Sequence, residues 1–259
     1  MKIKLFHKRI IGLALIASLW LASCQSLRVE KSDYTNIRID SAITLAPDAS
    51  IEKTITPYRA KLSADMKELL CQSADALEGG RPESPLTNYC SDLVLMESDI
   101  LIKKKNPSYY VDVAVVNRGG LRVTLPKGDI TVKTVFELMP FENEIVFLRL
   151  KGEILQKFAD HIASRGGEGI AGMKFGIKDG KATALTINGQ PVNLQSDYWM
   201  ATSDYVANGG DGSEILAKAD ERFDAGIRVR DMFIEHFRKM GKANQIIEAK
   251  TDGRIYHVE

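Results

Sequence analysis

The sequence predicts a layered, mixed α/β (α+β) domain with mixed sheets and covering helices. Segments with apolar residues at helical spacing alternate along the chain with short valine- and isoleucine-rich runs, an order typical of mixed α/β folds. The composition is that of a globular protein, with 44% hydrophobic and 27% charged residues among 259. A formal net charge of +1 provides no overall field to attract nucleic acid, so we expect any anion site to be local.

The first 23 residues have the pattern of a signal peptide. Basic side chains precede an apolar run over residues 10–21, which is too short to span a bilayer comfortably. The following Leu21-Ala22-Ser23-Cys24 resembles the lipobox of bacterial lipoproteins, whose cysteine is acylated. The alternative is an ordinary signal peptide with a cysteine nearby. We expect export and lipid anchoring through Cys24 to a bacterial cell membrane, on its periplasmic or surface face.

The next segment, residues 24–55, shows little periodicity and indicates a tether with an initial strand near residues 41–45. Residues 56–259 contain no internal repeat or clear boundary and are predicted to form one domain. Its first helix is expected over residues 57–77, where apolar residues share one face, and it ends at Gly79-Gly80. A second helix is expected over residues 86–96.

The remaining elements follow in alternation. Thr131 is placed to cap a short helix that stops before Pro140, and Asn188-Gly189 is a favourable tight-turn pair. We expect helices over residues 131–138, 153–164 and 227–240, and strands over residues 111–116, 144–150, 172–177, 182–187 and 198–203.

Two cysteines remain if Cys24 carries lipid. In an exported protein, Cys71 and Cys90 could form a disulfide worth about 3 kcal/mol of stability in the chain-entropy model. The equally weighted alternative is a pair of buried free thiols, because cysteine often serves as a small core residue.

Three loops contain residues suited to binding a ligand. The first loop, Asn117–Arg122, follows a strand and has two glycines that let the backbone approach a ligand. Its arginines could hold a phosphate through paired hydrogen bonds. The alternative is a tight turn with solvated arginines.

The second loop, Met139–Asn143, has a turn fixed by Pro140 and carries Phe141. The third loop, Tyr205–Gly212, offers an aromatic ring for stacking on a base and Asp211 for sugar hydroxyls. The alternatives are a core phenylalanine in the second loop and a helix-capping turn in the third.

In this order, the three loops resemble the C-terminal domain of the 5'-nucleotidase and UDP-sugar hydrolase family, over roughly residues 80–240. The family's Asn-x-Gly-Gly-x-Arg motif is matched by the first loop, its Pro-Phe turn by the second, and its aromatic-x-Ala-Asn-Gly-Gly-Asp-Gly motif by the third. The third motif is the most specific of the three, and the three motifs in this order are stronger evidence for the resemblance than any one motif alone. The matching positions are Asn117, Gly119, Gly120, Arg122, Pro140, Phe141, Tyr205, Asn208 and Asp211.

The resemblance implies that eight of these positions, all except Pro140, bind a nucleotide, and it gives specific roles to five of them. Phe141 and Tyr205 would sandwich the base, Arg122 and Asn117 would bind the phosphate side, and Asp211 would contact the ribose. The chain departs from the family at Tyr205, where phenylalanine is usual, and at Arg118, where glycine is common.

An upstream family segment is matched only in part. Arg81 to Asn88, followed by Asp92, resembles it, but Thr87 replaces a glycine, and residues 92–105 contain no arginine where the family has one.

In that family, hydrolysis belongs to an N-terminal metallophosphatase domain that holds two metal ions. The four histidines of this sequence, His7, His161, His236 and His257, do not belong to Asp-x-His or Asn-His-Glu patterns. We therefore expect no metal ligands or cofactor in this chain.

Three hypotheses follow. In a split enzyme, this chain binds the nucleotide and a separate metallophosphatase chain supplies a divalent metal pair. The alternatives are a surface lipoprotein that captures nucleosides or nucleotides without hydrolysis, and a degenerate domain kept for protein contacts.

Overall fold

The computed structural model describes residues 31–36 and 47–259. The expected signal peptide, the expected lipidation site Cys24 and the expected strand near residues 41–45 lie outside the described residues. The chain divides into two units, residues 1–52 and 53–259. Within the described ranges, no helix has both the length and the apolar character needed to cross a membrane.

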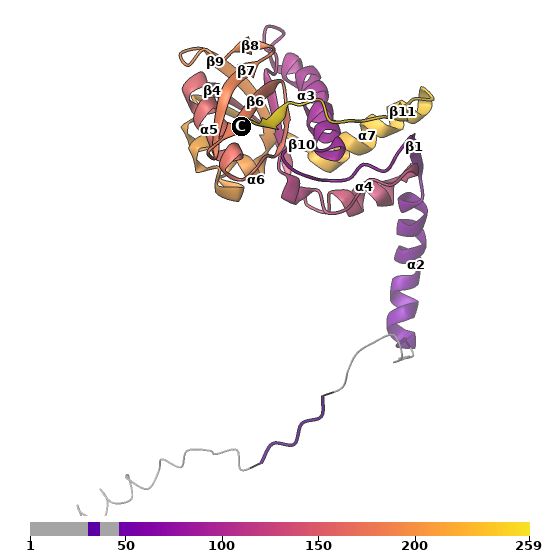
Figure 1. Cartoon of the computed structure of the whole chain (residues 1–259). Helices are drawn as coiled ribbons and strands as arrows, with labels where there is room; N and C mark the ends of the chain where they lie inside the picture. Colours follow the sequence, from indigo (N-terminus) through magenta and orange to yellow (C-terminus); the bar gives the residue numbers. More distant parts are fainter. Residues whose placement is uncertain (1–30, 37–46) are drawn as a thin grey trace, which may run out of the picture. The chain divides into compact units, whose positions relative to one another are not determined.

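A five-stranded sheet lies at the centre of residues 53–259 (Figure 1). Its strands run in the order β10-β4-β9-β2-β5. Strands β2 and β9 are parallel, whereas the other neighbouring pairs are antiparallel. The strands span Val113–Val116 (β2), Glu144–Lys151 (β4), Gly169–Ala171 (β5), Asp197–Ser203 (β9) and Glu221–Arg228 (β10).

The two faces of this sheet are buried in two different hydrophobic cores. In β4, Ile145 and Phe147 belong to one core, and Val146 and Leu148 belong to the other. Because successive side chains of a strand point to opposite faces, this alternation places the sheet between the cores. Burying each of these side chains stabilises the fold by about 1.5–3 kcal/mol.

Helices and two smaller sheets complete the layers. The first core includes side chains from α3, α4 and α7 and from the sheet β11-β1-β3, and the second includes α5 and the sheet β12-β6-β7-β8. The helices span Ala49–Met66 (α2), Pro85–Lys105 (α3), Val132–Leu138 (α4), Gly152–Ser164 (α5), Asp204–Ala207 (α6) and Val229–Lys242 (α7). The outer strands span Leu69–Ser73 (β1), Gly128–Thr131 (β3), Met173–Lys178 (β6), Lys181–Ile187 (β7), Gln190–Pro191 (β8), Ile246–Ile247 (β11) and Ile255–His257 (β12).

The mixed α/β class with covering helices is confirmed, as are several local signals. Thr131 caps α4, since its hydroxyl accepts a hydrogen bond from the Thr134 amide at 3.3 Å. Asn188 and Gly189, with φ of 50° and 77°, form the turn between β7 and β8. Both backbone angles lie in the left-handed region that this residue pair tolerates.

The helix predicted over residues 57–77 is confirmed as far as Met66 and is wrong beyond it. Helix α2 ends at Met66, and Leu69–Ser73 form β1, which pairs with β3 and β11. The apolar positions in this segment fit a helical period, but β1 is held by strand partners far away in sequence. The helix predicted over residues 86–96 extends to Lys105.

Cys71 and Cys90 are both buried and free, which decides between the two alternatives left open by the sequence. Burial raises the pKa of the Cys71 thiol to about 11 and the pKa of the Cys90 thiol still further. Both thiols are therefore protonated and unreactive near neutral pH.

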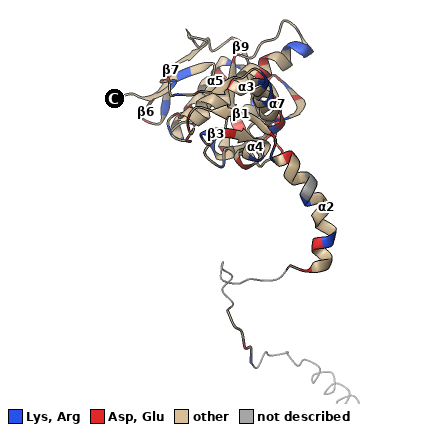
Figure 2. Cartoon of the chain, turned by 90° about the vertical axis from the view of Figure 1, so that its right-hand side faces the viewer, with Lys and Arg blue, Asp and Glu red and all other residues tan. Residues whose placement is uncertain are grey.

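Basic and acidic residues are interspersed over the helices and loops (Figure 2), in line with a net charge of +1. A local positive site must therefore come from particular arginines rather than from the protein as a whole.

Candidate functional site

The three loops meet at one end of the central sheet because of strand direction. The first loop follows β2 and the third follows β9, and these strands are parallel, with Ala114 opposite Ala201. The second loop precedes β4, which is antiparallel to β9, with Ile145 opposite Ser203. Two strand ends and one strand start therefore bring all three loops to the same sheet edge.

The loops enclose a pocket of about 350 Å³. Seven of the eight binding residues predicted from the sequence line it, together with Asn143, which was not in the predicted set. The eighth, Asn208, does not line this pocket; its Oδ1 accepts a hydrogen bond from Arg222 Nη1 at 2.7 Å. The lining residues are Asn117, Gly119, Gly120, Arg122, Phe141, Asn143, Tyr205 and Asp211.

Two aromatic side chains of the pocket are open to solvent. Phe141 is 47% exposed and Tyr205 is 44% exposed. The Arg122 guanidinium carbon lies 6.0 Å from the centre of the Phe141 ring, and Arg122 Nη1 donates to the Gly119 carbonyl at 3.1 Å. Exposed aromatic faces beside a cation suit a planar ligand that carries negative charge.

Gly210 makes room for the Tyr205 ring. A Cβ added at this position would lie 2.5 Å from both Tyr205 Cε1 and the Tyr205 carbonyl oxygen. Since that distance is far inside van der Waals contact, a larger residue would displace the ring or the third loop.

Asp211 is the hydrogen-bonding centre of the third loop. Its Oδ2 accepts from Asn117 Nδ2 at 3.0 Å, which joins the first and third loops, and its Oδ1 accepts from the Tyr205 hydroxyl at 3.4 Å. Arg165 Nη2 lies 3.5 Å from the same Oδ1. The Asp211 carbonyl accepts from His161 Nε2 at 3.0 Å, so the ring proton sits on that nitrogen. The carboxylate is thus fixed in place at the pocket.

The first loop is held by a buried carboxylate. Glu168 is only 7% exposed, and its Oε2 accepts the Arg118 amide hydrogen at 2.6 Å. Arg81 Nη2 and Arg165 Nε lie 3.7 Å and 3.8 Å from its Oε1. These arginines neutralise a charge whose burial would otherwise be costly, and Arg165 links Glu168 to Asp211.

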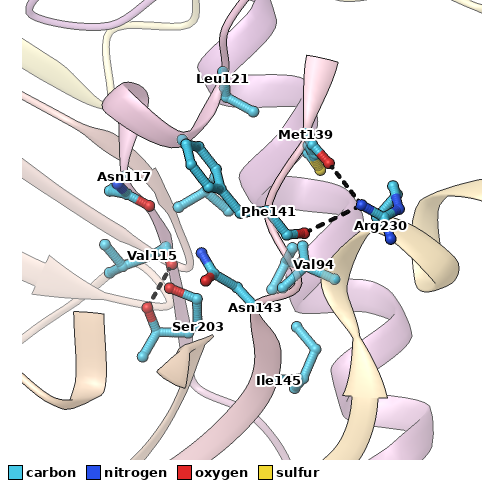
Figure 3. Close-up of a pocket in the computed structure, with 14 residues that line it drawn as sticks. Val94, Val115, Asn117, Leu121, Met139, Phe141, Asn143, Ile145, Ser203 and Arg230 are labelled. Atoms are coloured by element: carbon cyan, nitrogen blue, oxygen red, sulfur yellow. Dashed lines mark hydrogen bonds between the residues drawn. The ribbon is translucent and has the colours of Figure 1, made fainter. Parts of the chain in front are cut away.

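An apolar cavity adjoins the pocket through four shared residues, Asn117, Gly120, Phe141 and Asn143. Figure 3 shows the aliphatic side chains that line it. The pocket of the three loops therefore has a mainly apolar cavity beside it. Its lining includes Val94, Val115, Leu121, Met139, Ile145 and Val229, with Arg230 at one side.

Among residues 31–36 and 47–259, no group of three or more His, Cys, Asp and Glu side chains is placed to hold a metal ion. His236 Nδ1 lies 2.8 Å from Glu97 Oε1, in the contact between α7 and α3, and His161 contacts the third loop.

The matched family agrees with this geometry. Residues 64–218, more than half of the chain, match the family described as 5'-nucleotidase, C-terminal domain. The chain belongs to this family.

Curated relatives are much longer than this chain. Protein UshA of Yersinia enterocolitica is 30% identical over 192 residues, which cover 71% of this chain and 34% of that protein. The trifunctional nucleotide phosphoesterase protein YfkN of Bacillus subtilis is 26% identical over 253 residues, covering 90% of this chain and 16% of that protein. The chain thus spans about a third or less of the length of these relatives.

Solved structures show the same architecture. The 5'-nucleotidase precursor from Thermus thermophilus superimposes with a TM-score of 0.67 at 25% identity, over 83% of this chain and 44% of that chain. NAD nucleotidase from Haemophilus influenzae superimposes with a TM-score of 0.61 at 19% identity, over 82% of this chain and 42% of that chain. The latter similarity concerns the fold alone.

Sequence reasoning missed the residues that support the loops. Asn143 stood in the second loop but carried no separate signal. Glu168 and Arg165 follow a helix in a glycine-containing turn, and nothing in their local sequence indicates a contact with the first or third loop.

Proposed function

We propose that this chain binds nucleosides or nucleotides in the pocket of the three loops. It would form the substrate-binding part of a 5'-nucleotidase-type phosphoester hydrolase in nucleotide breakdown, with a divalent metal pair supplied by a separate metallophosphatase chain. The observation that carries the proposal is the convergence of the three motif loops on one pocket with two exposed aromatic rings.

Each lining group suits one part of a nucleotide. The exposed rings of Phe141 and Tyr205 offer faces for base stacking, which contributes about 1–3 kcal/mol per base in proteins that bind single-stranded nucleic acid. The Asn143 amide can both donate to and accept from a base edge. Asp211, already fixed by its neighbours, can accept hydrogen bonds from ribose hydroxyls, and the Arg122 guanidinium can bind phosphate oxygens.

The substrate-binding role is supported by the family match, because residues 64–218 match the family described as 5'-nucleotidase, C-terminal domain. The separate metal-bearing chain is motivated by the sequence, whose histidines do not belong to Asp-x-His or Asn-His-Glu patterns. The relatives named 5'-nucleotidase and nucleotide phosphoesterase support nucleotides as the substrate class. In the proposed reaction, the divalent metal pair of the partner chain would activate the attacking water.

Calorimetry tests the binding part of the proposal. The purified chain should bind AMP or adenosine, and Phe141→Ala and Tyr205→Ala should each weaken that binding. If wild type binds neither ligand, the nucleotide-binding proposal is wrong for the isolated chain.

A pull-down and an activity assay test the split arrangement. The chain should capture a metallophosphatase, and AMP hydrolysis with Mn²⁺ or Co²⁺ should require both proteins. Rapid hydrolysis by this chain alone would overturn the arrangement, and binding without hydrolysis by any captured partner would favour a nucleoside-capturing lipoprotein.

We also propose that Cys24 carries lipid and anchors the exported protein to a bacterial membrane. The support is the Leu-Ala-Ser-Cys sequence after the apolar run. Labelled fatty acid should be incorporated into wild type and not into Cys24→Ser, whose protein should leave the membrane fraction. Equal labelling of the two proteins would exclude Cys24.

A further inference from the structure

The second loop, which carries Phe141, is held from the junction between β10 and α7. Three alternating carbonyls of the loop accept hydrogen bonds from this junction. The Val229 amide donates to the Asn143 carbonyl at 2.9 Å, and Arg230 Nη1 donates to the carbonyls of Phe141 at 3.4 Å and Met139 at 3.5 Å. Figure 3 shows the two arginine contacts as dashed lines.

Arg230 is buried, although arginine is rarely buried without partners. It is 3% exposed, and its Nη2 donates to Glu142 Oε1. Its guanidinium carbon also lies 4.0 Å from the centre of the Phe136 ring. Carboxylate, carbonyls and ring together compensate for the charge in this site.

Glu142 completes the contact from the other side. Arg228 Nε lies 2.7 Å from Glu142 Oε2, so the two carboxylate oxygens are taken by two arginines of the same junction. The hydrogen bond from Arg230 and the charges of both arginines lower the pKa of the Glu142 carboxyl. The carboxylate therefore stays charged and paired near neutral pH.

We propose that Arg230 is a positioning residue of the nucleotide site: it sets the backbone of the second loop so that the exposed Phe141 ring faces the pocket. Arginine suits the role because its planar fork spreads its donors over separate nitrogens, so it reaches two carbonyls and a carboxylate together, whereas a lysine ammonium has its donors on a single nitrogen. Arg230 does not touch the ligand in this scheme. It lies outside residues 64–218, so the support comes from beyond the matched motifs.

The inference rests on the proposed function, and its test separates the two. Arg230→Met keeps much of the side-chain volume and removes the donors, and Arg230→Lys keeps the charge. The matched control is Arg238→Met, on the same helix, which removes an arginine paired with Glu68 at 2.7 Å rather than with the loop. The full chain is used in each case.

Two measurements are made on each variant. The first is calorimetry with AMP and with ribose 5-phosphate, a ligand that lacks the base. The second measurement is hydrogen exchange at the two ends of this contact, and it needs no ligand. The Val229 amide donates to the Asn143 carbonyl, and the Glu144 amide, which directly follows the second loop, donates to Asp204 Oδ1 at 3.2 Å. We expect Arg230→Met to weaken AMP about tenfold, the size of a lost base stack, and ribose 5-phosphate by less than about twofold. In Arg230→Met, the amides of Glu144 and Val229 should exchange faster than in wild type. Arg230→Lys should restore neither the AMP affinity nor the slow exchange, and Arg238→Met should match wild type in both measurements.

The outcomes distinguish the possibilities. Folded Arg230→Met with unchanged AMP affinity and unchanged exchange would overturn the inference, as would an equal loss of AMP and ribose 5-phosphate. If wild type binds no AMP, the proposed function fails, and the exchange data alone then decide whether Arg230 orders the loop. Should Arg230→Met not fold, the folded Arg230→Lys protein is judged by the same two criteria.

Discussion

The two aromatic walls of the pocket are supported in different ways. Around Tyr205, the backbone of the third loop has local support: the adjacent Ser213 Oγ donates to the carbonyl of Val206 at 2.6 Å and also lies 2.5 Å from that of Gly210. Remote residues hold Asp211 in this loop, through His161, Arg165 and Asn117. Around Phe141, the second loop is held by Arg230, about ninety positions away. The backbone that carries Tyr205 is therefore held by residues next to it in sequence, whereas the backbone that carries Phe141 is held by a residue of a distant helix.

This difference explains why the third motif is the more specific in sequence. A loop whose backbone is held by adjacent residues needs particular residue types at consecutive positions, such as Gly210 close to Tyr205, and these form a recognisable sequence motif. The second loop is held by a remote residue, so its own sequence needs only the turn at Pro140 and the ring of Phe141. A Pro-Phe pair alone is weak evidence for a binding site.

The largest effect is expected where the local support is broken. Gly210→Ala would place a Cβ 2.5 Å from the Tyr205 ring, so the ring must move out of place. If binding requires the ring to return to its place, strain of about 1–3 kcal/mol corresponds to a loss of AMP affinity of roughly fivefold to 150-fold. Calorimetry measures the AMP affinity of the variant, and thermal unfolding measures its stability. Gly189→Ala, at a turn away from the pocket, is the control for a glycine change, and equal AMP affinity in both variants would contradict the local account.

A smaller effect is expected when either ring is removed. Phe141→Ala and Tyr205→Ala should each lower AMP affinity about tenfold, because each removes one stacking face. If the two rings share one base, the double variant should lose less than the product of the single losses. Strictly additive losses in calorimetry would mean that the walls act on different parts of the ligand.

A smaller effect still is expected for the hydroxyl that distinguishes Tyr205 from phenylalanine. Its contact with Asp211 Oδ1 is long, at 3.4 Å, and lies at the exposed rim. Tyr205→Phe should therefore bind AMP within about twofold of wild type, since an exposed, long hydrogen bond contributes little net free energy. A tenfold loss would assign the hydroxyl a direct contact with the ligand.

Substitution of Asp112 is expected to leave AMP affinity unchanged, because this residue lies at the opposite end of β2 from the first loop. Its carboxylate is buried and accepts the Trp199 amide hydrogen at 2.8 Å, and burial raises its pKa from near 3.8 to about 6. Because the folded state holds the proton more tightly, its stabilising contribution is complete below about pH 4 and is lost as pH rises through 6.

The Asp112→Asn variant should lack this loss. Urea unfolding of wild type should show a falling midpoint between pH 4 and pH 7 relative to the variant, while AMP affinities of the two proteins stay equal. Parallel midpoints would show that Asp112 does not titrate in this range.

Much of the central sheet and its helices could be predicted from the sequence. β4 and α5 were found because the apolar residues of each segment show the period of a strand or of a helix without reference to their partners. β1 was predicted as helix and β10 was not predicted, because each is defined by pairing with strands remote in sequence. The pocket residues were found through their motifs, whereas Glu168, Arg165 and Arg230 act through contacts that only the fold creates.

The C-terminal segment fixes where a minimal fragment can end. A fragment that ends at Lys218 would include all three motifs. It would lack β10 and the β10–α7 junction that holds the second loop, and it would also lack β11 and β12, which pair with β1 and β6. Protein engineers who cut this domain at its motif boundary should obtain a chain with every recognisable residue and an unsupported binding site.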